Sequence, residues 1–323
     1  MPLMFDLPLD KCKTYQGTNP KPEDFDEFWD RSLDEMKSID PEVELIKSEF
    51  QPPFAECFDM YFTGVGGARI HAKLVNPLKA PSPHPAVLKF HGYSGNAGDW
   101  TEHLGFAGAG FTIASLDCRG QGGKSEDVGG VKGNTLRGHI IRGLEGPPEK
   151  MLFRQIFLDT AQLAKIVMEM EEVDESRVAA TGGSQGGGLT LACAALEPRV
   201  KCAAPIFPFL CDYKRVWNID LDQNAYAELR DYFRRFDPCH DREDEVFSKL
   251  GYIDVQHLAP RIKAEIMMLT SLLDQTCPPS TQFAAYNKIT SEKSMVLYPD
   301  FGHENLPGAS DKIFQFLLKL NSN

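Results

Sequence analysis

Residues 180–189 read Ala-Thr-Gly-Gly-Ser-Gln-Gly-Gly-Gly-Leu, and this stretch decides how the chain is interpreted. The apolar residues before it predict a strand that ends near Thr181, and a helix is predicted from Gly186 to Leu196. A serine in the pattern G-x-S-x-G between a strand and a helix is typical of a nucleophile on a sharp, strained turn. Only small neighbours let strand and helix approach closely there. The stretch therefore predicts that Ser184 is a nucleophile; the alternative is a glycine-rich turn with an incidental serine.

A serine hydroxyl is a weak nucleophile until a base takes its proton, so the chain must also supply a histidine and an acid that orients it. His303 follows the last predicted strand, Ser294–Tyr298, where the chain order serine, acid, histidine places the base. The other histidines after Ser184 are His240 and His257, and both lie in a polar interruption of the pattern. The sequence therefore predicts His303 as the base.

Three aspartates compete for the role of the acid. Asp274 comes just after the predicted strand Glu265–Thr270 and before His303, as the chain order requires. Asp300 ends the strand that leads to His303, which favours a role in a turn, and Asp254 is a more distant third candidate. Asp274 is the preferred prediction, and it rests on chain order alone.

A carbonyl under attack develops a negative oxygen, which needs preorganised hydrogen-bond donors. One donor is usually the backbone N–H of the residue after the nucleophile, here Gln185, and the second comes from a loop after an earlier strand. The loop His91-Gly92-Tyr93 ends the apolar run Ala86–His91 and offers the Tyr93 N–H as this second donor. The His91 side chain itself is better explained as a hydrogen-bonded residue of a buried turn.

Strand-like runs alternate with helical patterns from Pro85 onwards. The predicted strands are 86–91, 111–118, 177–181, 200–207, 265–270 and 294–298, and the main predicted helices are 153–170, 186–196, 280–289 and 311–320. Such alternation produces a mainly parallel sheet that is covered on both faces. The fold class is therefore α/β, and we expect a single domain over residues 1–323.

Two segments stand outside this alternation. Residues 1–80 form an N-terminal extension with a helical apolar pattern near Phe25–Met36, a strand-like run at Val43–Phe50 and a hairpin that leads to Arg69–Val75. Residues 211–260 are polar, aromatic and too long for an ordinary connection, so they should contain helices of their own. This insertion is predicted to be either a cap over the site or a decorative or subunit-contacting element, and the pattern does not choose between them.

The composition excludes several classes of function. The 323 residues include 46 acidic and 34 basic side chains, and the resulting charge of −12 would repel a nucleic-acid backbone. No run approaches the ~18 apolar residues of a membrane span, and the acidic, proline-containing start does not resemble a signal peptide. Eight cysteines, none in C-x-x-C, are too sparse for a disulfide scaffold, although an even count leaves some pairs possible. We therefore expect a reduced, cytoplasmic protein.

The motifs that would indicate a cofactor are missing. Gly123-Lys124-Ser125 resembles the end of a phosphate-binding loop, but Cys118 stands where that motif requires a glycine. No G-x-G-x-x-G follows a strand, no H-E-x-x-H occurs, and the histidines are scattered. We therefore expect neither a dinucleotide nor a metal ion.

Together, His91-Gly-Tyr, Arg119-Gly-Gln121, Gly182-Gly-Ser-Gln-Gly186 and His303-Glu304 resemble carbohydrate esterase family seven. This family contains the acetyl xylan esterases and cephalosporin C deacetylases, which have the α/β-hydrolase fold. The resemblance runs over nearly the whole chain and includes the N-terminal extension and residues 274–286. It implies a serine esterase that removes acetyl groups from small substrates, such as xylo-oligosaccharides and cephalosporin C, through an acetyl-enzyme and without a cofactor.

The resemblance also implies residue roles and an assembly. Ser184 would be the nucleophile, His303 the base, Asp274 its orienting acid, Tyr93 and Gln185 the oxyanion donors, and Arg119 and Gln121 structural residues. The acyl pocket is expected to fit a methyl group and to be shaped partly by Gln275 and Thr276. An intracellular homohexamer is implied. The alternatives are a serine peptidase or another acyl hydrolase on the same fold, or a catalytically silent binding protein.

Overall fold

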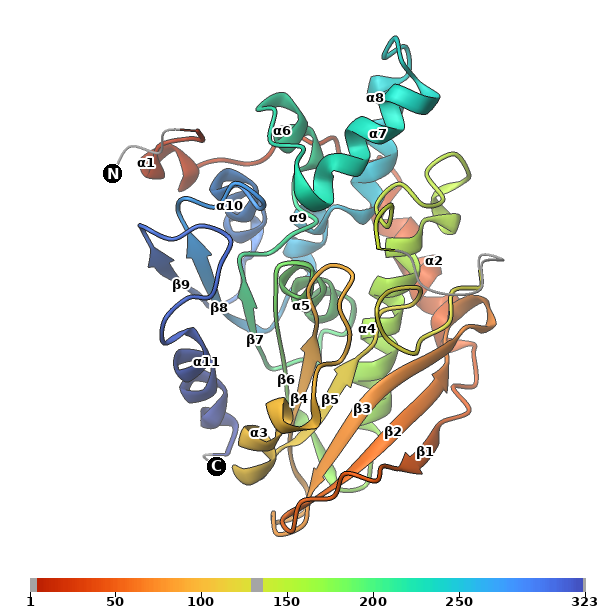
Figure 1. Ribbon diagram of the computed structural model, residues 1–323, viewed down its shortest axis with the longest axis vertical. Helices are drawn as coiled ribbons and strands as arrows, with labels where there is room; N and C mark the ends of the chain where they lie inside the picture. The colour runs from red at the N-terminus through yellow and green to blue at the C-terminus, as the bar shows by residue number, and fades with distance from the viewer. Residues whose placement is uncertain (1–4, 129–135, 322–323) are drawn as a thin grey trace.

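The computed structural model describes residues 5–128 and 136–321, and within them one nine-stranded sheet forms the centre (Figure 1). The strand order is β1-β2-β3-β5-β4-β6-β7-β8-β9. The pairs from β1 to β5 along this order are antiparallel, and all pairs from β5 to β9 are parallel. The strands are β1 Glu44–Lys47, β2 Ala55–Thr63, β3 Arg69–Pro77, β4 His84–Phe90, β5 Thr112–Leu116, β6 Val173–Gly183, β7 Cys202–Ile206, β8 Glu265–Ser271 and β9 Lys293–Tyr298.

Helices cover both faces of the central part of this sheet, as the side chains of β4 show. The helices are α1 Leu9–Cys12, α2 Phe25–Lys37, α3 Leu104–Gly108, α4 Leu152–Met168, α5 Gln185–Leu196, α6 Tyr213–Asn218, α7 Ala227–Phe236, α8 Glu243–Leu250, α9 Val255–Leu258, α10 Pro279–Lys288 and α11 Ala309–Leu318. Successive side chains on a strand point to opposite faces. On β4, Ala86 and Leu88 join the core that contains α4 and α5, whereas Val87 joins the core that contains α3 and α11. The predicted α/β class is therefore confirmed.

The N-terminal extension is continuous with the sheet. Strands β2 and β3 form a hairpin, and β3 pairs with β5 through Ala72↔Leu116 to Val75↔Ile113. Helix α2 packs Trp29 against Phe157 of α4, with ring centroids 5.9 Å apart, because its apolar residues recur on one face. The boundary near residue 80 is thus a change of sequence pattern and not a break in the sheet.

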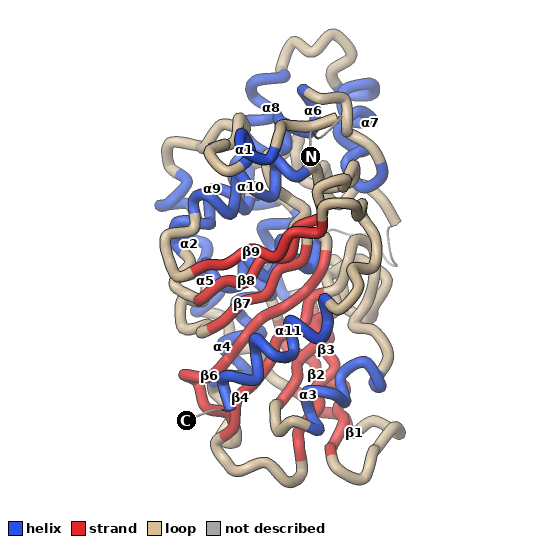
Figure 2. Tube along the Cα trace, turned by 90° about the vertical axis from the view of Figure 1, so that its left-hand side faces the viewer, coloured by secondary structure: helices blue, strands red, loops and turns tan. Residues whose placement is uncertain are grey.

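The insertion contains helices, as the sequence predicts; α6, α7 and α8 lie at one end of the molecule in both views, and α9 lies nearer the sheet, against α5 (Figures 1 and 2). Its aromatic residues are largely buried within the chain, namely Tyr213, Tyr226, Tyr232 and Phe233. The N-terminal segment also binds it, because the Asp212 carboxylate accepts hydrogen bonds from the backbone N–H groups of Thr18 (3.0 Å) and Asn19 (2.8 Å). The insertion is therefore part of the fold of its own chain.

The described residues include all eight cysteines, and every one is a free thiol. Seven are buried, and only Cys239 is exposed. Within residues 5–128 and 136–321, no helix is both long and apolar enough to cross a bilayer. The first four residues, on which part of the argument against a signal peptide rests, lie outside the described ranges.

A buried histidine in the insertion makes stability depend on pH. His257 in α9 packs its ring 5.8 Å from Phe25. Burial is the main cause that lowers the pKa of His257 to about 3, and Lys288 and Lys21 add to it. The unfolded chain binds a proton at this residue below pH ~6.5, whereas the folded chain does so only near pH 3. The stabilisation that the buried, neutral His257 ring provides is therefore complete above pH ~6.5. It is lost as the pH falls towards the pKa of His257 in the folded chain.

We expect His257→Gln to weaken this dependence. Between about pH 7.5 and about pH 5, the free energy of unfolding of the variant should fall by roughly 2 kcal/mol less than that of the parent protein. Urea unfolding at both pH values measures the difference. The surface variant His240→Gln is the control, because His240 is exposed and pairs with Glu243. Equal losses for His257→Gln and the parent protein would contradict the expectation.

Candidate active site

The turn between β6 and α5 has the strained backbone that the glycine pattern predicts. Ser184 has φ +58° and ψ −119°, a combination that places it in the left-handed half of the map. A Cβ atom on Gly186 would lie 2.0 Å from the carbonyl oxygen of Phe90, and one on Gly182 would lie 2.5 Å from the same oxygen. Only glycine at both positions lets β6 and α5 approach β4 so closely. The turn holds the Ser184 side chain at the start of α5.

Three side chains from the carboxyl ends of three parallel strands meet at this turn. The Nε2 atom of His303, which follows β9, lies 3.0 Å from the Oγ of Ser184. The Nδ1 atom of His303 lies 2.8 Å from an oxygen of Asp274, which follows β8. Asp274 is fully buried, and its other oxygen accepts hydrogen bonds from the N–H groups of Thr276 (2.8 Å) and Cys277 (2.7 Å). The histidine is thus oriented by a carboxylate that is itself held in place.

The rival candidates lie elsewhere. Asp300 is exposed in a turn after β9. Asp254 caps α9 and accepts hydrogen bonds from Asp212 N and Gln256 N. The geometry therefore brings Asp274, and neither of these aspartates, to His303.

The two loops that could supply an oxyanion hole lie side by side. Gln185 is the first residue of α5, so its N–H points out of the helix without a partner within it. Its side chain exchanges hydrogen bonds of 2.9 and 3.0 Å with Gln121. The carboxamide oxygen of Gln121 also accepts the Ser94 N–H at 2.9 Å. Gln121 thus bridges the start of α5 to the loop that carries Tyr93.

The other predicted structural residues have the surroundings that the sequence suggests. The guanidinium of Arg119 is buried and binds both oxygens of Asp159, at 2.6 and 2.7 Å. His91 lies in a turn, where its Nδ1 hydrogen-bonds to the Gly92 carbonyl (2.7 Å) and its Nε2 accepts the Cys118 N–H (3.0 Å). Neither side chain contacts the serine–histidine–aspartate arrangement.

The insertion reaches both sides of the site. The Tyr93 hydroxyl donates a hydrogen bond to Glu228 of α7, and the Tyr93 ring packs 4.7 Å from His139 and 5.8 Å from Phe209. Burial raises the pKa of Glu228 to about 7, although the bond from Tyr93 opposes this shift. Asn224 donates to the Thr276 hydroxyl at 3.0 Å. The insertion therefore contacts both the Tyr93 loop and the acid loop.

One cysteine of the core also lies at the site. Cys277 is fully buried, and Asp274, Cys277 and His303 bring possible metal-ligating atoms within 4.8 Å of one another. Burial is the largest cause that raises the pKa of this thiol well above its ordinary value, while a hydrogen bond with Ser184 lowers it. Asp274 and Ser184 already hydrogen-bond to the two ring nitrogens of His303. These side chains therefore need no ion to keep them in place. Cys277 is best regarded as a neutral neighbour of the nucleophile.

Sequence reasoning missed the site contacts of three residues. Cys277 lies in the core, but its position three residues after Asp274 also signals proximity to the site. Glu228 and Asn224 carry no such signal, because they lie in the insertion and meet the site only through the tertiary fold.

A serine on a strained strand-to-helix turn, a histidine and a buried aspartate after later strands, and this sheet topology together define an α/β hydrolase of the serine type. The chain belongs to the acetyl xylan esterase family, whose model matches residues 1–320 under the description "Acetyl xylan esterase (AXE1)". The family predicted from the sequence motifs is thereby confirmed, and with it the class of enzyme, the carboxylic ester hydrolases.

Individual relatives agree with this assignment. Acetyl xylan esterase 1 from Thermoanaerobacterium sp. JW/SL YS485 is 62% identical with a TM-score of 0.96, over 98% of this chain and 100% of that one. Acetyl xylan esterase from Paenibacillus sp. R4 is 37% identical with a TM-score of 0.90, over 96% and 99% of the two chains. Acetyl esterase Axe7A of Xylanibacter ruminicola is 26% identical over 290 residues, which cover 86% of this chain. The aligned part spans only 62% of the length of Axe7A.

Proposed function

We propose that the protein is a serine esterase that removes acetyl groups from small acetylated substrates, with xylo-oligosaccharides and cephalosporin C as the two substrates to test. The observation that carries the proposal is the continuous set of hydrogen bonds Ser184–His303–Asp274 in a chain of the acetyl xylan esterase family. Ser184 and His303 are only partly buried, so a substrate can reach them.

The geometry supports a two-step mechanism. Nε2 of His303 takes the proton of the Ser184 hydroxyl as Oγ attacks the ester carbonyl, and the same proton passes to the departing sugar oxygen. Water, activated by the same histidine, then attacks the acetyl-enzyme and releases acetate. Asp274 holds the imidazole in the tautomer that has hydrogen on Nδ1 and stabilises the imidazolium that forms in each step.

The negative oxygen of each tetrahedral intermediate is assigned to the backbone N–H groups of Gln185 and Tyr93. Both loops are fixed relative to each other through Gln121 before substrate arrives. Donors that are positioned in advance need no reorganisation as charge develops, and removing one such donor costs about 10²- to 10³-fold in rate. These roles need no metal ion and no organic cofactor.

The acyl pocket is proposed to fit a methyl group. Two neighbours of the acid crowd this side of Ser184, because Cys277 is buried beside it and Thr276 is held by Asn224 of the insertion. Gln275 is exposed and is the weaker candidate of the two residues named from the sequence. A longer acyl chain would have to displace the insertion or the acid loop.

We expect specificity constants to fall steeply from acetate to octanoate esters. Each methylene that the site cannot house should cost roughly 1–3 kcal/mol until the chain leaves the pocket. A series of esters that share one chromogenic alcohol measures the effect, with an acetylated peptide-type amide as the control for peptidase activity. Comparable values of kcat/KM for acetate and octanoate would refute the methyl-sized pocket, and faster cleavage of the amide would favour the peptidase alternative.

The cellular setting and the assembly are proposals as well. Eight free thiols suit a reducing, cytoplasmic setting. A homohexamer is proposed from the family resemblance, but the buried aromatic residues of the insertion do not supply its contacts. Apolar side chains at and beside the edge strand β1 are better candidates, because Val43, Leu45 and Ile46 are 42%, 46% and 47% exposed.

Light scattering should therefore give about six times the chain mass of 36.0 kDa. If the active sites face an enclosed chamber, deacetylation should also be much faster on xylo-oligosaccharides than on polymeric xylan. The double variant Leu45→Lys/Ile46→Lys, which adds charge to the exposed edge, should dissociate the assembly. A stable monomer with full activity on the polymer would contradict both parts of the proposal.

A further inference from the structure

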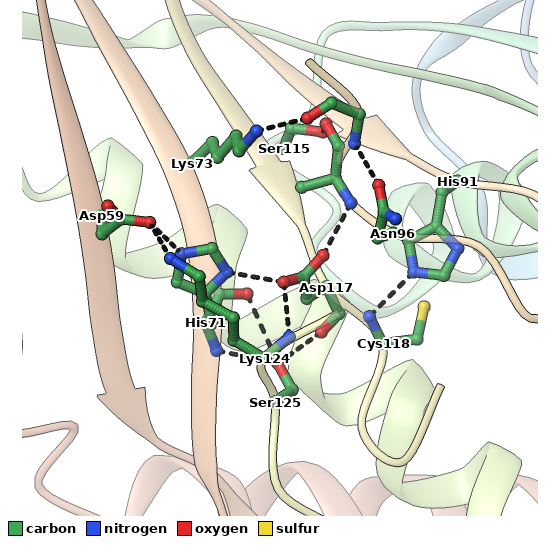
Figure 3. A network of polar contacts seen from close by, with 12 residues as sticks. Asp59, His71, Lys73, His91, Asn96, Ser115, Asp117, Cys118, Lys124 and Ser125 are labelled. Carbon is green, nitrogen blue, oxygen red and sulfur yellow. Dashed lines mark hydrogen bonds and ion pairs between the residues drawn. The ribbon is translucent and has the colours of Figure 1, made fainter. Parts of the chain in front are cut away.

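A charged network lies on β2, β3 and the loop after β5, where the antiparallel part of the sheet meets the parallel part (Figure 3). At its centre is His71 of β3, whose side chain is 1% exposed. Its Nδ1 lies 2.6 Å from an oxygen of Asp117, which follows β5, and its Nε2 lies 2.7 Å from an oxygen of Asp59 on β2. The ring thus joins two carboxylates across three strands.

Hydrogen-bond chemistry relates the charge of His71 to the charges of its two carboxylate partners. An ionised carboxylate can only accept hydrogen bonds, and a neutral imidazole donates from one nitrogen only. Burial raises the pKa of Asp117, but hydrogen bonds from His71 and from backbone N–H groups outweigh it, so the net direction is downward. Burial also opposes ionisation of Asp59, yet bonds from Lys124 and His71 lower its pKa. Two ionised carboxylates can both accept a hydrogen bond from the ring only when both ring nitrogens of His71 carry hydrogen.

The charges of the network then balance. Two negative groups, Asp59 and Asp117, face two positive groups, His71 and Lys124, whose ammonium lies 2.8 Å from Asp59. Tyr61 is the other titratable side chain against the ring, 5.0 Å away. A neutral group in place of His71 would leave an uncompensated negative charge in a largely buried setting, which is costly.

Asp117 connects the network to two loops of the active site. One of its oxygens accepts the Ala97 N–H at 2.6 Å, and the other accepts the Lys124 N–H at 2.8 Å. It therefore ties together the loop after β4, which carries Tyr93, and the loop after β5, which carries Gln121. The same two loops are joined by Gly122 N to Gly95 O at 2.9 Å and by the contacts of His91 and Gln121 given above.

We propose that His71 is a positioning residue for catalysis: clamped between Asp59 and Asp117, it holds the Asp117 carboxylate in the orientation that anchors the Tyr93 loop. It acts through Asp117 and does not touch the substrate. The inference rests on the proposed function, because the oxyanion role of the Tyr93 N–H is part of that proposal.

Two substitutions of His71 separate its two contacts. In His71→Asn the amide nitrogen lies about where Nδ1 was and can still donate to Asp117, whereas in His71→Gln it lies about where Nε2 was and faces Asp59. Both remove the same charge. We expect His71→Gln to lower kcat for an acetyl ester by ~10- to 100-fold with little change in KM, because small misplacements of a catalytic loop have effects of this size. His71→Asn should lose much less activity.

An inhibitor supplies a second measurement, and this measurement would not change if His71 only stabilised the fold. Methylboronic acid forms a tetrahedral adduct with a serine nucleophile and places an oxygen in the oxyanion hole. Its inhibition constant should rise in His71→Gln in parallel with the fall in kcat, and change little in His71→Asn. Equal kcat values for the two variants, or a loss confined to KM, would overturn the inference.

Two isosteric variants keep the inference testable if the His71 variants do not fold. Asp117→Asn should lower kcat as His71→Gln does, whereas Asp59→Asn, on the far side of the ring, should stay within about 3-fold of the parent protein. Equal losses in these two variants would also overturn it. The parent protein distinguishes the two proposals: if it fails to cleave acetyl esters, the proposed function is wrong, and if it cleaves them while the variants behave alike, only the positioning role is wrong.

Discussion

Ser184→Ala should lower kcat for an acetyl ester by about 10⁶-fold, the size of loss that removal of a triad serine causes in a well-measured hydrolase. The reason is that the attacking hydroxyl lies 3.0 Å from His303 Nε2, and alanine has no hydroxyl to replace it. The free energy of unfolding should change little, since the small side chain is only partly buried at the surface of the turn. Initial rates at high enzyme concentration, with unfolding curves alongside, measure both quantities.

The serine and the histidine should act as a unit. His303→Ala should cost about as much as Ser184→Ala, and the double variant should lose little more than either single one, because each change alone disables the same step. Additive losses would show that the two residues act in separate steps. Activity within about 10-fold of the parent protein in Ser184→Ala would exclude this serine as the nucleophile.

Asp274→Asn should cost about 10⁴-fold in kcat. The Thr276 and Cys277 N–H groups already bind one oxygen of Asp274, so the amide nitrogen of the variant would face His303 Nδ1. A donor there forces the imidazole into the tautomer that cannot accept the serine proton. Asp300→Asn is the matched control, because Asp300 is exposed and close in sequence to His303, and it should stay within about 3-fold of the parent protein. A severe loss in Asp300→Asn with a mild one in Asp274→Asn would reverse the assignment of the acid.

The fold was largely accessible from the sequence because strand and helix periodicities are local signals. Residues 265–270 and 294–298 are predicted strands that match β8 and β9 to within one residue at each end. The sequence did not show that β2 and β3 extend the main sheet, since pairing of β3 with β5 is a long-range contact. The sequence also left the role of the insertion open, and most of its aromatic residues pack into the same core as α4 and α5, whereas Phe236 is 57% exposed.

The structure brings together the three residues that chain order singled out. Ser184, Asp274 and His303 each follow a parallel strand, and the carboxyl ends of such strands share one edge of the sheet. Glu228 and the network of Asp59, His71 and Asp117 could not be predicted. Their sequence neighbours show no motif, and their partners come from other strands and from the insertion. Support for a catalytic loop is a property of the tertiary structure.

The most direct test of the account is to find the acetyl group on the enzyme. The protein is mixed with para-nitrophenyl acetate, an ester whose good leaving group favours accumulation of the acetyl-enzyme, and the reaction is stopped in acid within the first turnover. Peptide mass spectrometry should then show one acetyl group on the Ser184 hydroxyl, and none in Ser184→Ala treated in the same way. Rapid turnover of the ester without acetylation of Ser184, or acetylation at another residue on the path of turnover, would contradict the account.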